Sequence, residues 1–178
     1  DLYIPDYNLA IEYHGLAHHS ERPVYGPKDV AKIKIQHEQK YELCKVSGIT
    51  LIQIFEDEWL RKREVVKSML RNRLGLSNKK VHARKCEVRE LSKKEARCFF
   101  EENHVAGHVP ASKAWGLYFG DNLVTALSVR RPWTKSYGTT LEGAIFASAL
   151  DHTVSGWFQK LLKQAELSGV PQGFETIL

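Results

Sequence analysis

Two short hydrophobic runs open the chain, at residues 2–4 and 9–13, and a polar segment separates them. β-Branched and aromatic residues fill both runs, whereas the segment between them is rich in turn-forming residues. We predict two antiparallel strands in which Ile4 faces Leu9. Side chains alternate along a strand, so one face would carry Asp1, Tyr3, Ala10, Glu12 and His14.

After these strands comes a segment whose apolar residues have helical spacing. Apolar side chains recur every three or four residues from Val30 to Cys44, which predicts a helix that ends at Gly48. Residues 49–55 are almost continuously apolar, as in a strand buried on both faces. A second helix is predicted over 59–74. Its inward side chains would be Val65, Val66, Met69 and Leu70. This order predicts an α/β fold in which helices flank a mixed sheet.

The second half of the chain has a similar mixture of elements. A strand is predicted over 87–91, and the capping box of Ser92 and Glu95 begins a helix that reaches about Asn103. Further predictions are a hairpin of strands 115–119 and 123–129, a strand over 141–146 and a helix over 157–167. Residues 77–86 have the composition of a linker. We therefore expect a first domain over 1–76, a basic linker over 77–86 and a small α/β domain over 87–178.

The net charge of +5 is concentrated in one segment. Residues 79–97 hold eight basic and three acidic side chains, so this segment accounts for the whole excess. Its basic residues are Lys79, Lys80, Arg84, Lys85, Arg89, Lys93, Lys94 and Arg97. A solvated surface is one explanation of such a run, and contact with phosphate groups is the other.

The amino-acid composition indicates a folded protein and shows no sign of a membrane-spanning or secreted one. Hydrophobic residues make up 43% of the 178 residues, which is enough for packed cores. No apolar run is long enough to span a membrane, and no signal peptide is evident. The three cysteines show no C-x-x-C spacing, so we expect a reducing, cytoplasmic setting. The chain begins at Asp1 rather than at a methionine and ends in an apolar run, so we expect a fragment truncated at both ends.

The facing carboxylates of Asp1 and Glu12 are the main candidates for chemistry. Two like charges directly opposed on neighbouring strands destabilise the pair, so a fold that places them there usually supplies a cation. His14 lies on the same predicted face, and His18 and His19 follow within one turn. Carboxylates with imidazoles beside them are typical of a metal-dependent hydrolase.

Two residues of the first predicted helix also lie near this face. Lys40 is at the edge of the apolar stripe, so its ammonium group can approach Asp1 and Glu12. It can equally be a surface lysine whose stem covers apolar neighbours. His37 is expected to pack at the edge of the core rather than to bind a ligand.

These motifs resemble the nuclease core of very-short-patch-repair (Vsr-like) endonucleases. They are more similar to the phage and intron-encoded homing endonucleases built on that core. The matching blocks are D-x-Y-I-P from residue 1, I-E-Y-H-G from residue 11, H-H-S-E from residue 18 and K-Y-E-L-C-K-V-S-G-I-T-L-I-Q-I-F-E-D-E-W from residue 40. The resemblance covers about residues 1–76 and implies a fold related to the PD-(D/E)xK nucleases.

The resemblance also implies roles for individual residues. Asp1 matches the metal-binding aspartate and the carbonyl of Tyr13 matches a second metal contact, with Glu12 as a further ligand. Mg²⁺ is the expected ion and Mn²⁺ the alternative. His14 or His19 would transfer the proton, since an imidazole titrates near neutral pH. The expected partner is double-stranded DNA, bound through Lys40, Lys79, Lys80, Arg84 and Lys85.

The chain departs from the family in two ways. The family supplies a further acidic residue from a helix before the first strand, and this chain starts after that position. Repair enzymes of the family carry large aromatic residues after the glycine, where this chain has Leu16 and Ala17. We therefore expect a homing-type endonuclease of a phage or a bacterium rather than a mismatch-repair enzyme.

Three alternatives stay open. The chain can be a DNA-binding module without nuclease activity. It can hold a structural Zn²⁺ ion through His14, His18, His19 and Cys44, although that spacing matches no common zinc pattern. The second domain, which weakly resembles N-acetyltransferases of the GNAT-like fold, can belong to a DNA-modifying acyltransferase. Only residues 154–156 represent the glycine-rich turn that such an enzyme places before its last helix.

Overall fold

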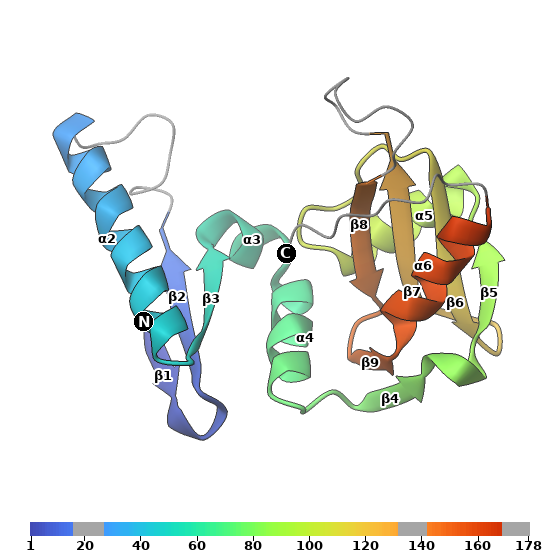
Figure 1. Ribbon diagram of the computed structural model, residues 1–178, viewed down its shortest axis with the longest axis horizontal. Coiled ribbons are helices and arrows are strands. Elements are labelled where there is room, and N and C mark those ends of the chain that lie inside the picture. The colour runs from blue at the N-terminus through green and yellow to red at the C-terminus, as the bar shows by residue number, and fades with distance from the viewer. Residues whose placement is uncertain (16–26, 132–141, 169–178) are drawn as a thin grey trace. The chain divides into compact units, whose positions relative to one another are not determined.

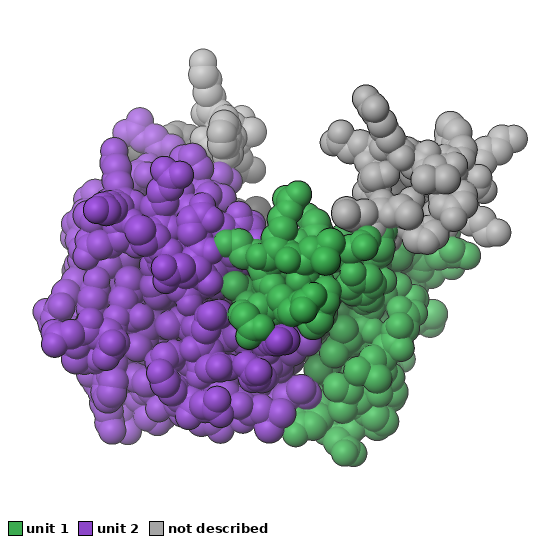
Figure 2. Space-filling model, turned by 180° about the vertical axis from the view of Figure 1, so that it is seen from behind, with its two compact units in different colours: residues 1–66 green, residues 67–178 purple. Residues whose placement is uncertain are grey.

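The computed structural model describes residues 1–15, 27–131 and 142–168, and of residues 27–34 the backbone alone. It is a mixed α/β protein with several sheets, as predicted (Figure 1). The chain divides into two compact units, residues 1–66 and 67–178 (Figure 2). The boundary between these units falls inside helix α4 (Arg63–Arg73).

Unit 1 is built on a three-stranded sheet. Its elements are β1 (Leu2–Ile4), the short 3-10 helix η1 (Pro5–Tyr7), β2 (Leu9–His14), α2 (Pro27–Val46), β3 (Thr50–Phe55) and α3 (Glu56–Arg61). The sheet order is β1-β2-β3, with β1 antiparallel and β3 parallel to β2. Ile4 pairs with Leu9 and Leu2 with Ile11, so the predicted register of the first two strands is confirmed.

The end of α2 positions the third strand. Gly48 has a φ of +67°, the left-handed conformation that glycine adopts most easily, and the amide of Ile49 donates to the carbonyl of Cys44 at 2.8 Å. The predicted end of this helix is therefore confirmed. The chain reverses here and enters β3, which runs parallel to β2.

The helix predicted over 59–74 is two helices. The backbone leaves helical geometry at Lys62, between α3 and α4. The first of them begins earlier than predicted, at Glu56, because the Glu58 carboxylate accepts a hydrogen bond from the amide of Phe55 at 3.1 Å. Val65 and Val66 are buried as expected, but the predicted inward position of Met69 is wrong, since half of its surface is exposed.

Unit 2 contains a four-stranded antiparallel sheet and a separate two-stranded sheet. Its elements after α4 are β4 (Lys79–His82), η2 (Ala83–Lys85), β5 (Glu87–Glu90), α5 (Lys93–Asn103), β6 (Lys113–Phe119), β7 (Asn122–Arg130), β8 (Glu142–Ser148), β9 (His152–Ser155) and α6 (Trp157–Leu167). The order in the larger sheet is β5-β6-β7-β8, and β4 pairs in parallel with β9. The predicted helices, the capping box and the hairpin of this half are confirmed.

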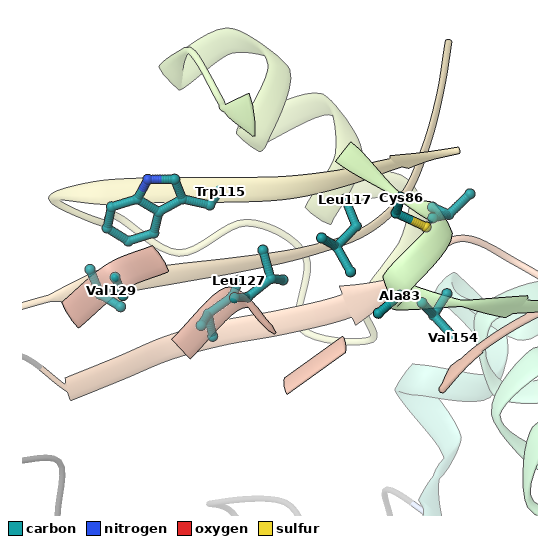
Figure 3. Close-up of a cluster of buried hydrophobic side chains, with 10 residues drawn as sticks. Ala83, Cys86, Trp115, Leu117, Leu127, Val129 and Val154 are labelled. Atoms are coloured by element: carbon teal, nitrogen blue, oxygen red, sulfur yellow. The ribbon is translucent and has the colours of Figure 1, made fainter. Parts of the chain in front are cut away.

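Two helices cover opposite faces of the larger sheet (Figure 1). On one face, Trp115, Leu117, Leu127 and Val129 of β6 and β7 point into a core that also contains Leu161 and Ala165 of α6 (Figure 3). On the other face, Phe99 and Phe100 of α5 pack against small residues of the sheet. A larger residue at Gly116 would force Leu123 to move, because a Cβ atom would lie 2.3 Å from one of its methyl groups.

Residues 77–86 are part of unit 2, so the prediction of a linker is wrong. Lys79 to His82 form β4, and Ala83 and Cys86 are buried in the same core as Trp115. The segment shows no strand pattern in the sequence, because its three apolar residues, Val81, Ala83 and Cys86, stand among basic and polar side chains. The two predicted domain boundaries at 76 and 87 are replaced by one division, between Val66 and Lys67.

Candidate active site

The central strand of unit 1 carries the buried carboxylate of Glu12. The pairing of Leu2 with Ile11 continues toward Asp1 and Glu12, which are the next residues along β1 and β2. On the other side, β2 pairs with β3, where Gln53 is the partner of Glu12. Lys40 and His37 of α2 contact the Glu12 side chain, which is buried, whereas Asp1 is exposed.

Lys40 joins these two carboxylates. Its ammonium group donates to Oδ2 of Asp1 at 3.1 Å and to Oε1 of Glu12. The predicted approach of Lys40 to this face is therefore confirmed. The ammonium group of Lys40 is thus the positive charge between the two facing carboxylates. Because one ammonium group contacts both, the two carboxylates face the same small volume.

Two imidazoles lie on the other side of Glu12. Nδ1 of His37 is 3.7 Å from Oε1 of Glu12, and the rings of His37 and His14 have centroids 4.8 Å apart. His14 is buried and stacks on Phe55 at the end of β3, with ring centroids 4.9 Å apart. His37 and Lys40 are three residues apart on α2, which puts both on the same helix face.

Burial would raise the pKa of Glu12, but the positive neighbours outweigh it. The hydrogen bond and the charge of Lys40, with smaller contributions from His14 and His37, hold the pKa of this carboxyl below its ordinary value. Glu12 is therefore ionised at neutral pH despite its burial. An ionised buried carboxylate is the form that can bind a cation.

Glu12, His14 and His37 form the one group of possible metal ligands found within the described ranges. One donor atom from each residue lies within 4.8 Å of the other two. The second carboxylate oxygen of Glu12, Oε2, is buried and has no hydrogen-bond partner among the residues that the structure describes. A buried carboxylate oxygen without a partner is costly, so this atom is suited to a ligand. Sequence reasoning missed His37, because helical spacing alone assigned it to the edge of the core.

The other predicted site residues are distributed as follows. Tyr13 lies on β2 with an exposed side chain, and only its carbonyl was expected to bind a metal. His19 and His18 lie outside the described residues. Cys44 is half-buried on α2 and does not belong to the metal-ligand group, so the described part of the chain does not assemble the alternative zinc site.

The basic residues predicted to bind DNA are exposed in unit 2. Lys79 and Lys80 lie on β4, and Arg84 and Lys85 lie on the short helix η2. Lys160 of α6 fixes this helix, since its ammonium group donates to the carbonyl of Ala83 at 2.8 Å and also to that of Cys86.

The basic residues at the end of β7 and just after it differ in their surroundings. Arg130 donates to the carboxylate of Glu142 at 2.7 Å, so its charge is partly neutralised within the sheet. Arg131 is exposed, and Lys135 lies outside the described residues.

No protein-family model, no curated protein and no solved structure matches this chain. The resemblance to Vsr-like endonucleases therefore rests on the motifs themselves. Among the described helices, none has the length and apolar character needed to cross a bilayer.

Proposed function

We propose that this protein is a metal-dependent endonuclease that hydrolyses phosphodiester bonds in double-stranded DNA, of the Vsr-like, PD-(D/E)xK-related homing type. The observation that carries the proposal is the convergence of Asp1, Glu12 and Lys40, in which one ammonium group contacts two carboxylates. Two carboxylates and a lysine at one end of a mixed sheet are the groups that such hydrolysis requires.

The two carboxylates fit a divalent cation. They face one small volume that already holds a positive charge, and oxygen donors of this kind suit Mg²⁺ or Mn²⁺. Asp1 and Glu12 would hold the ion, with the Tyr13 carbonyl as a third oxygen. When bound, the ion supplies a Lewis acid that stabilises negative charge on a phosphate oxygen.

Lys40 has two roles in this proposal. Its ammonium group keeps Glu12 ionised, which prepares the carboxylate for a cation. Once a metal ion takes over the carboxylates, the same ammonium group is available to a phosphate oxygen or to the attacking water. In the resembled family, the motif E-x-K supplies a lysine two residues after the glutamate. Here Glu12-Tyr13-His14 occupies that motif and has histidine instead. Lys40 therefore takes the place of the motif lysine in this proposal.

The proton-transfer step is assigned to an imidazole. His14 is buried between Phe55 and His37, which favours a positioning role over direct contact with substrate. His19 stays the predicted residue for proton transfer. The exposed basic residues of unit 2 would hold the DNA backbone, where each neutralised phosphate contributes about −0.9 to the slope of log affinity against log salt.

A second candidate function is DNA binding without cleavage. This alternative is favoured by Lys40, which already neutralises Asp1 and Glu12. The two carboxylates therefore need no metal ion to be stable side by side. The two candidates differ in one measurable property, which is the dependence of strand cleavage on a divalent ion.

The test is cleavage of supercoiled plasmid by the full chain with Mg²⁺ or with EDTA, with DNA binding measured in parallel in Ca²⁺. We expect nicked or linear product with Mg²⁺, no cleavage with EDTA, and DNA binding in Ca²⁺. Binding without cleavage in Mg²⁺ and in Mn²⁺ would contradict the nuclease and support the binding module.

A further inference from the structure

We propose that Glu12, His14 and His37 form a binding site for a divalent transition-metal ion of the Zn²⁺ class, which shares Glu12 with the oxygen donors assigned to Mg²⁺ but adds two imidazoles in place of Asp1 and the Tyr13 carbonyl. One carboxylate and two imidazoles are the donor set, and they come from the central strand β2 and from helix α2. This site goes beyond the proposed nuclease function, because it is defined by metal binding alone.

The geometry of the three residues is close to that of a bound site. Their donor atoms lie within 4.8 Å of one another, and the ring of His37 already reaches the carboxylate of Glu12, with Nδ1 3.7 Å from Oε1, the oxygen that Lys40 also contacts. Ligands about 2.0–2.2 Å from a tetrahedral zinc ion are about 3.3–3.6 Å from one another. Small side-chain rotations therefore bring the group to the distances of a zinc site.

The burial of Glu12 and the missing hydrogen bond to one of its oxygens are an independent reason to expect a ligand here. Its side chain is more than nine-tenths buried, and Oε2 has no hydrogen-bond partner among the described residues. Lys40 contacts Oε1, the other oxygen of the same carboxylate. Because each carboxylate oxygen can bind a separate partner, Glu12 can contact the ammonium group and a metal ion at the same time.

The donor chemistry selects the ion. Imidazole nitrogens suit Zn²⁺, Co²⁺ and related transition-metal ions, whereas Mg²⁺ prefers oxygen ligands and retains its water. Two histidines and one glutamate leave a fourth position of a tetrahedral ion for water or substrate. Such a site would bind Zn²⁺ in the absence of DNA, and excess Mg²⁺ would not displace the ion.

Optical titration with Co²⁺ tests the proposal, with the full chain stripped by EDTA and then freed of the chelator. We expect one equivalent of Co²⁺ to produce visible absorption bands, which Zn²⁺ removes and excess Mg²⁺ leaves unchanged. The variant His37→Gln should weaken Co²⁺ binding by more than about 10-fold, since even the loss of a residue that only supports a ligand costs about 10–100-fold. The matched variant His82→Gln, at an exposed histidine of β4, should bind as the wild type does.

The variant Asp1→Asn separates this site from the proposed nuclease ligands. Co²⁺ binding should persist in Asp1→Asn, because Asp1 is not part of the nitrogen-rich group. Loss of Co²⁺ binding in Asp1→Asn together with retention in His37→Gln would overturn the proposal and leave the nuclease proposal intact.

A second measurement uses the wild-type protein and so does not depend on the folding of any variant. His37 is partly exposed, so diethyl pyrocarbonate can modify it, and mass spectrometry can follow the rate. We expect Zn²⁺ to protect His37 and to leave His82 unprotected. Equal modification of His37 with and without Zn²⁺ would refute the site.

Discussion

Replacement of Lys40 by methionine removes the ammonium group that joins Asp1 and Glu12 but keeps an apolar stem of similar length. The substitution abolishes a charge-assisted hydrogen bond to a carboxylate whose side chain is 8% exposed. Glu12 would then be a buried charge without its main neutralising partner. We expect Lys40→Met to destabilise unit 1.

The magnitude follows from the exposure of each partner. A hydrogen bond to a charged group contributes about 1.5–3 kcal/mol, and breaking a fully buried ion pair costs about 3–5 kcal/mol. Lys40 is 42% exposed and Asp1 67% exposed, so water replaces part of the interaction and the ion pair with Asp1 adds little. We therefore expect a decrease of about 2 kcal/mol in the free energy of unfolding of unit 1.

The destabilisation should depend on pH in a defined direction. The pKa of Glu12 lies below its ordinary value of 4.5 in the folded protein, because Lys40 outweighs the effect of burial. The stabilisation that depends on the ionised form is therefore fully present above pH 4.5 and is lost as the pH falls through the folded pKa. The difference between wild type and Lys40→Met should shrink as the pH falls below 4.5.

Amide hydrogen exchange of residues 9–14 measures the effect inside unit 1, without interference from unit 2. A change of about 2 kcal/mol corresponds to an exchange rate about 30-fold higher in the variant at neutral pH. Because wild type and variant are compared at the same pH, the intrinsic exchange rates cancel in the ratio.

Lys45→Met is the matched control on the same helix. Lys45 is 3.9 Å from Glu42, and both side chains are about 60% exposed, so this pair should contribute about 0.5 kcal/mol or less. Equal effects of the two substitutions, or a ratio for Lys40→Met that stays constant however far the pH falls below 4.5, would refute the reasoning.

Two further predictions concern unit 2. Reversal of Lys79, Lys80, Arg84 and Lys85 to Glu should weaken DNA binding for all sequences alike and flatten its salt dependence by about 0.9 for each phosphate that is no longer neutralised; an unchanged slope in a filter-binding titration would show that these exposed residues do not touch DNA. Ser92→Ala should cost about 1 kcal/mol and lower the melting temperature by about 4 °C, because the Ser92 hydroxyl accepts from the amide of Glu95 at 3.2 Å. Ser112→Ala, at an exposed serine outside any cap, is its control, and calorimetry showing equal shifts would contradict the capping argument.

Local patterns in the sequence were sufficient to predict most elements of the fold. The register of β1 and β2 follows from a short turn and strict alternation, and the capping box of Ser92 and Glu95 marks the start of α5. The sequence does not predict the structure of segment 77–86, because the core that buries Ala83 and Cys86 includes Val154 of β9, about seventy residues later in the sequence.

The candidate site was predicted in part for the same reason. Asp1 and Glu12 belong to neighbouring strands, so alternation alone placed them on one face. Lys40 was predicted from its position at the edge of the helix stripe, and the structure brings it to both carboxylates. His37 was missed as a site residue, because its approach to Glu12 and His14 depends on how α2 packs on the sheet. Helical periodicity does not specify that distance.

The central claim is that Asp1 takes part in metal-dependent cleavage of DNA, and one comparison tests it most directly. The rate of plasmid nicking in Mg²⁺ is measured for the wild type, for Asp1→Asn and for Asp6→Asn, a control at an exposed aspartate of η1. The account predicts that Asp1→Asn lowers the rate by more than about 100-fold, since a bound metal ion contributes several kcal/mol, while Asp6→Asn nicks at the wild-type rate. Nicking by Asp1→Asn at the rate of Asp6→Asn would contradict it.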